Sequence, residues 1–140
     1  MRVVFDTNVV LDVLLDRAPF ADVAVQLFAK VEHGECIGVL CATTLTTIYY
    51  LTAQTLQAPQ AIDHVRRLLQ LFEVAPVNRA VLETALTVHF PDFEDAVIHE
   101  SARHANAEAI VTRNTQDFAQ AVLPIYTPHE LLTVLIARQT

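Results

Sequence analysis

Acidic residues in three separate segments of the sequence could act together at a metal-dependent site. Asp6 directly follows a short apolar run, Asp95 belongs to an acidic cluster, and Asp117 lies near the end of the chain. Carboxylates packed within a few ångströms repel one another, and a hard divalent cation relieves that repulsion. Such a cation lowers the pKa of a bound water and holds a phosphate oxygen, so this combination favours hydrolysis of a phosphodiester.

The residues before Asp6 predict how its carboxylate is aimed. Residues 2–6 are typical of a short buried strand with Asp6 at its carboxyl end, and Asn8 is expected to cap the helix that follows. In open α/β sheets, ligands bind just beyond the carboxyl ends of the strands. Asp6 is therefore a candidate site residue, and a role as a simple strand end or helix cap is the competing interpretation.

Predicted strands alternate with amphipathic helices along the whole chain. The strands are expected at residues 2–6, 37–40, 72–77, 109–112 and 125–126. This alternation predicts a parallel sheet with helices on both faces, in a single domain of residues 1–140. Loops that follow parallel strands share one edge of the sheet. Asp6, Asp117 and the helix that starts near Asp92 are therefore expected to meet at that edge.

The acidic cluster at residues 92–95 also has a structural interpretation. Asp92 and Asp95 stand three residues apart at a helix start, so Asp92 is interpreted as the helix cap. Asp95 borders the apolar face of the helix and can point toward the sheet edge. Glu94 suits either a neighbour of the metal ligands or an exposed first-turn acid. His99 shares the side of Asp95 and is expected to form a surface Asp–His pair with it.

Composition and charge narrow the functional classes. The net charge of −7 argues against binding nucleic acid by bulk electrostatics, although a nuclease with acidic metal ligands also looks acidic. Lys30 is the sole lysine, so a P-loop or Schiff-base mechanism has almost no candidate. Cys36 and Cys41 would lie ~16 Å apart along one strand, too far for a disulfide, and are expected to be reduced. No apolar run is long enough for a membrane span and no signal peptide is recognisable, so we expect a cytoplasmic protein without membrane contact.

Apolar residues are abundant on two predicted helices in the first half of the chain. They are Leu45, Ile48, Tyr49, Leu51, Val65, Leu68 and Leu69. On the second helix, Ile62, Val65, Leu68 and Leu69 are expected to face inward. One small sheet is not expected to cover the whole set, and exposed apolar patches usually mark interfaces. A homodimer is therefore expected.

Three segments together resemble the PIN-domain ribonucleases, especially the VapC-type toxins of toxin–antitoxin pairs. Residues 3–12 (VVFDTNVVLD) resemble the opening strand with its first metal-binding aspartate, Asp6. Residues 92–96 (DFEDA) resemble the third acidic segment, in which Asp95 matches the ligand. Residues 110–118 (IVTRNTQDF) resemble the last segment, which offers Asn114 and Asp117. Each motif is weak by itself, whereas their order and spacing are fairly specific.

The resemblance implies a three-layer α/β/α sandwich with a mainly parallel five-stranded sheet. It also implies a metal-dependent endoribonuclease acting on RNA with Mg²⁺ or Mn²⁺, a homodimer, and a small antitoxin partner. By this resemblance the metal ligands and catalytic residues are Asp6, Asp95 and Asp117. The residues expected around them are Asn8, Thr47, Asp92, Glu94 and Asn114.

One position departs from the family pattern. The family usually carries a glutamate early in the helix after the second strand, and Thr47 occupies that place. A threonine brings no charge, so a catalytically weak or inactive PIN-like domain that binds RNA or a protein is the main alternative. A haloacid-dehalogenase-type phosphatase is a third interpretation. It would need an aspartate where Asn8 stands, so the sequence disfavours it.

Overall fold

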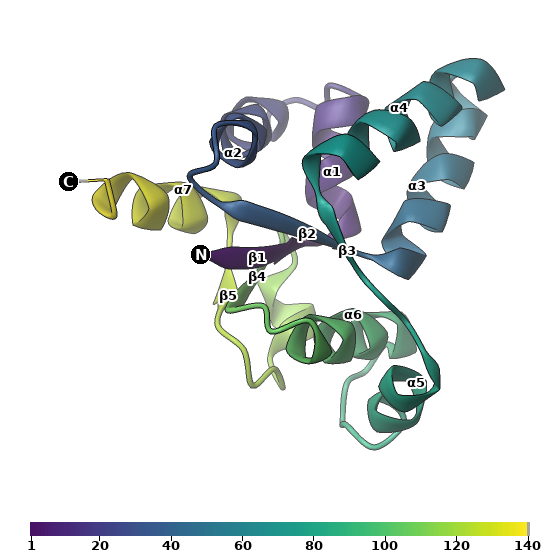
Figure 1. Cartoon of the computed structure of the whole chain (residues 1–140), viewed down its shortest axis with the longest axis vertical. Helices are drawn as coiled ribbons and strands as arrows, with labels where there is room; N and C mark the ends of the chain where they lie inside the picture. The colour runs from purple at the N-terminus through teal and green to yellow at the C-terminus, as the bar shows by residue number, and fades with distance from the viewer. Residues whose placement is uncertain (140) are drawn as a thin grey trace.

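Five parallel strands form the middle layer of the protein, in a computed structural model that describes residues 1–139 (Figure 1). The strands are β1 (Arg2–Phe5), β2 (Ile37–Cys41), β3 (Glu73–Ala75), β4 (Ala109–Val111) and β5 (Ile125–Tyr126). Their order in the sheet is β3-β2-β1-β4-β5, and each neighbouring pair is parallel. The strand order reverses between β1 and β4, which is the place where open α/β sheets bind ligands.

Helices cover both faces of the sheet, as the resemblance implied (Figure 1). On one face lie α1 (Thr7–Leu14), α2 (Ala21–Glu32), α3 (Ala42–Thr55), α4 (Ala58–Leu71) and α7 (Pro128–Ala137). On the other face lie α5 (Arg79–Ala85) and α6 (Phe93–His104). A short 3₁₀ helix, η1 (Thr115–Phe118), joins β4 to β5. The three-layer α/β/α architecture is therefore confirmed.

The central strand β1 is buried on both sides because its neighbouring residues serve different layers. Val3 and Phe5 belong to the core under α1, α2 and α7, whereas Val4 belongs to the core under α5 and α6. The Phe5 ring packs edge-on against Phe28 and Phe72, with ring centroids 6.0 and 5.2 Å away. Burial on both faces explains the uninterrupted apolar run in the sequence. It also fixes the position at which Asp6 leaves the sheet.

The start of α1 differs from the expectation that Asn8 caps this helix. The helix begins at Thr7, and the capping residue is Asp6, whose carboxylate accepts a hydrogen bond from the Thr7 N–H. Asp6 has the extended backbone of an N-cap, with φ −68° and ψ 154°, so Asn8 is already inside the helix. Asp6 therefore ends the strand and caps the helix at once. This double structural role leaves its second carboxylate oxygen for other partners.

Two cysteines are buried, whereas two apolar residues of α4 are exposed to solvent. Cys36 and Cys41 are free, as expected, and both are buried. Burial raises the pKa of the Cys36 thiol to about 11. Ile62 and Leu69 were expected to face inward, and this is wrong, since they are 41% and 51% exposed on α4. They are exposed because α4 packs on α3 as a hairpin that overhangs the sheet (Figure 1).

Within residues 1–139, no helix has the length and apolar character needed to cross a membrane.

Candidate active site

Asp6 is held at the carboxyl end of β1 by three neutral donors. Its Oδ1 accepts from the Thr7 N–H at 2.8 Å, and its Oδ2 accepts from the Thr112 hydroxyl at 2.8 Å and the Asn8 amide at 3.1 Å. The residue is only 7% exposed. Burial is the largest effect on the Asp6 pKa and raises it, the three hydrogen bonds oppose that rise, and the charge of Asp117 adds to it. The carboxylate is thus fixed in place without a cationic partner.

Thr112 connects the two segments that carry Asp6 and Asn114. It follows β4 and is fully buried. Its hydroxyl donates to Asp6 and accepts from the backbone N–H of Asn114 at 3.1 Å. Asn8 donates to the same hydroxyl at 3.2 Å and accepts from the backbone N–H of Arg113 at 3.2 Å. These bonds tie the loop after β4 to the start of α1, so both loops open at one edge of the sheet.

Asp95 lies in the first turn of α6 at the same edge. Its backbone N–H donates to Asp92 at 3.2 Å, so Asp92 is the helix cap, as predicted. The Asp95 pKa is raised to about 7, first by burial and then by the charges of Asp6, Asp92, Asp117 and Glu94. Acids from three distant segments are therefore near enough to repel one another. The convergence expected from the strand topology is present in the structure.

The other polar side chains of the site are more open to solvent than Asp6. Glu94, Asn114 and Asp117 are exposed, whereas Asp95 is half-buried. Among residues 1–139, no group of three or more acidic, histidine or cysteine side chains is close enough to enclose a metal ion. Mg²⁺ usually takes only one or two protein carboxylates and keeps several waters. The donor set of hard oxygen atoms with excess negative charge fits such an ion, which would relieve the part of the Asp95 pKa rise that comes from repulsion among the acids.

Helix α3 contributes hydroxyl groups and no carboxylate to this region. Thr44 is buried, and its hydroxyl accepts from the Thr7 hydroxyl at 3.3 Å, directly beside Asp6. Thr47 is half-buried one turn further along, and its hydroxyl donates to the carbonyl of Thr43 at 3.0 Å. Residues three apart lie on one face of a helix, so Thr47 shares the side of Thr44. The sequence analysis did not predict that Thr44 contacts Thr7, the residue after Asp6.

Asp12 was also missed by sequence reasoning. It is 1% exposed on α1 and accepts from Arg17 Nε at 2.9 Å. Arg113 donates to both of its oxygens, at 2.7 and 3.2 Å. Arg17 also donates to the carbonyl of Asn8 at 3.1 Å. This ion-pair cluster holds the loop after β4 against α1, and it meets the hydrogen bonds that hold Asp6 at Asn8.

The expected surface pair of Asp95 and His99 is wrong. His99 is 1% exposed, and its Nδ1 lies 2.7 Å from Oε2 of Glu100. Its Nε2 accepts from the N–H groups of Val122 and Leu123 at 3.1 and 3.4 Å, so the proton resides on Nδ1. Burial is the main reason that the His99 pKa is lowered. The expectation failed because the segment after η1 covers this side of α6.

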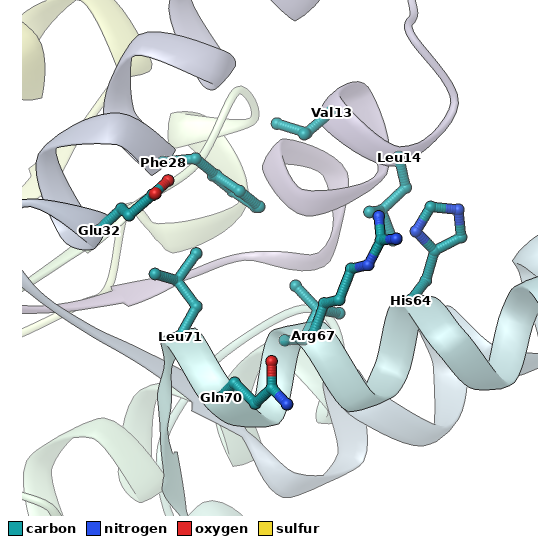
Figure 2. A pocket seen from close by; sticks show the side chains of 9 residues that line it. Val13, Leu14, Phe28, Glu32, His64, Arg67, Gln70 and Leu71 are labelled. Atoms are coloured by element: carbon teal, nitrogen blue, oxygen red, sulfur yellow. The ribbon is translucent and has the colours of Figure 1, made fainter.

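A separate groove of about 510 Å³ lies between α1, α2 and α4. Figure 2 shows that side chains from these three helices line it. The apolar lining residues are Val13, Leu14, Phe28, Leu68 and Leu71, and the polar ones are Glu32, His64, Arg67 and Gln70. The groove does not include any of the acids near Asp95. It is therefore a distinct surface feature.

A family model described as a PIN domain matches residues 2–116. The chain belongs to the PIN domain family. Ribonuclease VapC1 of Aquifex aeolicus (strain VF5) is 21% identical to this PIN domain over 134 residues, covering 92% of each chain.

Solved structures share the PIN fold across nearly the whole chain. VapBC2 from Rickettsia felis, bound to a promoter DNA fragment, matches with a TM-score of 0.72 and 14% identity over 91% of this chain and 98% of that one. A toxin–antitoxin complex from Klebsiella pneumoniae matches with a TM-score of 0.69 and 23% identity over 91% and 98%. These likenesses agree with the strand order and layers described above.

Proposed function

We propose that this PIN domain is a metal-dependent endoribonuclease of the VapC type, the toxin of a toxin–antitoxin pair. The observation that carries the proposal is the cluster of mutually repelling carboxylates at the carboxyl edge of the sheet, where burial first and then the charges of the neighbouring acids raise the Asp95 pKa to about 7. Similarity to a protein named as a ribonuclease and to solved toxin–antitoxin complexes supports the substrate and the partner. Phosphodiester hydrolysis is the reaction that such an acidic site favours.

The residues that would hold Mg²⁺ or Mn²⁺, directly or through bound waters, are Asp6, Asp95 and Asp117. A bound divalent ion would lower the pKa of a water and neutralise charge on the phosphate. Asn8 and Thr112 fix the orientation of the Asp6 carboxylate, and Asp92 fixes the start of the helix that carries Asp95. Asn114 and Glu94 would contact waters or RNA at the rim of the site. The positions of these side chains around one edge of the sheet support the proposed roles.

Protonation of the Asp95 carboxyl is expected to make metal binding depend on pH. With a pKa of about 7, this carboxyl carries a proton on about half of the molecules at neutral pH. The proton must leave before the oxygen can serve as a ligand. Metal affinity is therefore expected to rise as the pH increases from 6 to 8.

A cleavage assay on mixed RNA tests the proposed function. We expect cleavage with Mg²⁺ or Mn²⁺ and none with a chelator. Asp6→Asn and Asp95→Asn should each reduce the rate by at least about a hundredfold, because each removes a charge at the reacting centre. Asp63→Asn is the matched control, since Asp63 is exposed on α4. Full activity of Asp6→Asn or Asp95→Asn would sink the proposal, as would cleavage that persists with the chelator.

The alternative function is a PIN domain that binds RNA or protein without cleaving RNA. The observation that favours it is the absence of any carboxylate on α3, where Thr44 and Thr47 supply only hydroxyl groups. Metal-independent RNA binding with no cleavage under any metal would select this alternative. Metal-dependent cleavage abolished by Asp95→Asn would reject it.

An antitoxin partner has a suitable docking surface in the groove between α1, α2 and α4 (Figure 2). Its apolar floor and charged rim suit an amphipathic helix from a small protein. Co-purification with the product of a neighbouring small reading frame tests this placement. Arg67→Glu should weaken the complex, because Arg67 lines the groove. Arg66→Glu is the matched control, because Arg66 is 72% exposed on the same helix and does not line the groove.

A homodimer is also part of the proposal. Tyr50, Leu51, Ile62 and Leu69 are exposed on the α3–α4 hairpin, with Tyr50 at 66% and Leu69 at 51%. Exposed apolar groups of this kind usually mark an interface. Sedimentation at tens of micromolar should therefore show a dimer that Leu69→Lys disrupts. A monomeric wild-type protein at that concentration would contradict this part of the proposal.

A further inference from the structure

The ion-pair cluster around Asp12 carries one more positive charge than negative. Arg17 and Arg113 both pair with this single buried carboxylate. The other ion pairs within residues 1–139 match each carboxylate with no more than one arginine or lysine, as Arg2 does with Glu73. Arg17 and Arg113 are 38% and 24% exposed, so their guanidinium groups reach solvent. In a chain with a net charge of −7, this is a local positive site.

A mostly apolar cleft of about 470 Å³ adjoins this positive site. Its lining residues are Pro19, Phe20, Val23, Arg113, Thr127, Pro128 and His129, and we call it the Phe20 cleft. Phe20 is 39% exposed, and the guanidinium carbon of Arg113 lies 3.9 Å from its ring centroid. The cleft thus places a guanidinium group over one face of an aromatic ring. Single-stranded nucleic acids are bound by this combination, because bases stack on aromatic rings and phosphates pair with arginine.

Arg113 links the Phe20 cleft to the sheet edge where Asp6, Asp95 and Asp117 meet, which we call the acid edge. Arg113 lies between Thr112, whose hydroxyl donates to Asp6, and Asn114. The backbone N–H of Arg113 donates to Asn8, whose amide donates to Asp6. Arg113 therefore belongs both to the lining of the Phe20 cleft and to the segment that joins Thr112 to Asn114. None of the residues in this chain of hydrogen bonds lines the groove between α1, α2 and α4.

We propose that the Phe20 cleft binds one nucleotide of single-stranded RNA next to the scissile phosphodiester. The base stacks against Phe20 and Pro128, and the adjoining phosphate pairs with Arg17 and Arg113. This inference rests on the proposed nuclease function and adds a substrate-binding site to it. It also explains how an acidic protein attracts RNA without a large basic surface. The two arginines are held in place by Asp12, so they are oriented before RNA arrives.

RNA binding can be measured separately from cleavage. We would titrate a fluorescein-labelled single-stranded RNA of mixed sequence with the Asp95→Asn protein in Mg²⁺ and follow the fluorescence anisotropy. Phe20→Leu keeps an apolar side chain and removes the aromatic face. Loss of one stacked base should weaken binding by about fivefold or more, since stacking is worth about 1–3 kcal/mol per base. Thermal unfolding of each variant checks that it is folded.

Arg17→Gln gives a second measurement with a matched control. It should weaken binding for all sequences alike and lower the slope of log affinity against log salt by about 0.7, the value for one phosphate of a single strand. Arg66→Gln removes the same charge from an exposed site on α4 and should change neither quantity. The two arginine variants have equal net charge. A difference in RNA affinity or salt slope between them therefore depends on where the arginine lies in the structure.

Three outcomes would overturn the inference. If RNA binds but folded Phe20→Leu and Arg17→Gln bind it as tightly as the parent, the Phe20 cleft is not an RNA site, and the nuclease proposal survives. If Phe20→Leu impairs association with a protein partner and leaves RNA binding unchanged, the cleft belongs to that partner. If the wild-type protein neither binds nor cleaves RNA, the nuclease proposal fails as well.

Discussion

Asp6 and Asp12 stand six residues apart in the sequence, and both are buried. Asp12 pairs with positively charged groups, whereas Asp6 has only neutral hydrogen-bond donors. Asp12 accepts from two guanidinium groups, so its charge is more than compensated inside the protein. Asp6 accepts only from a hydroxyl, an amide and a backbone N–H. Neutral donors fix a carboxylate in place without neutralising its negative charge, so the carboxylate can still bind a cation. The Asp12 carboxylate therefore joins two loops, whereas the Asp6 carboxylate can bind a cation from solution.

The same contrast extends to the segments around the two residues. Asp95 and Asp117 add negative charge on the side of Asp6, and the pKa values of Asp6 and Asp95 are raised. Arg17 and Arg113 add positive charge on the side of Asp12. Acidic and basic groups therefore lie next to one another at the same sheet edge. For a phosphodiester substrate, the first group of charges suits a metal ion and the second suits the phosphate backbone.

The largest expected effect that tests this contrast is on folding stability. Asp12→Asn leaves two arginines around an uncharged group, so the free energy of unfolding should fall by about 3–5 kcal/mol. Asp6→Asn removes a charge that has no cationic partner and should cost little or stabilise the metal-free protein. Urea denaturation of both variants measures the difference. Similar losses in the two variants would break the comparison.

A smaller effect is expected from adding charge on the side of Asp6. Thr47→Glu would restore the carboxylate that the family usually carries on α3, and it should tighten Mn²⁺ binding by roughly tenfold to a hundredfold. Thr46→Glu is the matched control, because Thr46 is exposed beside it and its hydroxyl donates to the carbonyl of Thr43. Calorimetric titration at neutral pH measures both affinities. Equal affinities for the two variants would mean that Thr47 does not face the metal site.

The smallest expected effect is a pH dependence from Asp95. Its folded pKa of about 7 lies above the ordinary value of 3.8, so the folded state favours the protonated form. The stability that this gives is fully present below pH 3.8 and is lost as the pH rises through about 7. Because the side chain is half-exposed, the loss should be on the order of 1 kcal/mol after screening by solvent.

Denaturation of the metal-free protein at pH 5 and pH 8 measures the Asp95 effect. Asp95→Asn should remove most of the difference between the two pH values and should be more stable than wild type at pH 8. Asp63→Asn should behave like wild type, because its carboxylate is exposed on α4 and pairs with Arg66. A wild-type pH dependence that Asp95→Asn leaves unchanged would assign the titration to another group.

Much of the fold could be predicted because its signals are local in the sequence. The apolar run before Asp6, the cap at Asp92 and the alternation of strands and helices each fall within a few residues. The meeting of Asp6, Asp95 and Asp117 followed from strand topology, since loops after parallel strands share an edge. Their roles as metal ligands remain predictions.

The contacts that could not be predicted join residues far apart in the chain. The ion pair of Asp12 with Arg113 spans 101 positions, and no local pattern distinguishes it from a surface charge. His99 was misplaced for a similar reason, because the segment at Val122 that covers it comes 23 residues later. Leu69 has the spacing of a buried residue, and only the overhang of the α3–α4 hairpin exposes it.

The bond between Asp6 and Thr112 has a consequence for synthesis of the chain. Its two residues are 106 positions apart, and β1 has no neighbour on that side until β4 is made. At translation rates of about 5–20 residues per second, the interval between the two residues is about 5–20 s. Parallel pairing over such a separation is also intrinsically slow. A nascent chain therefore carries Asp6 well before the acid edge is complete, because Thr112 is made 106 positions later.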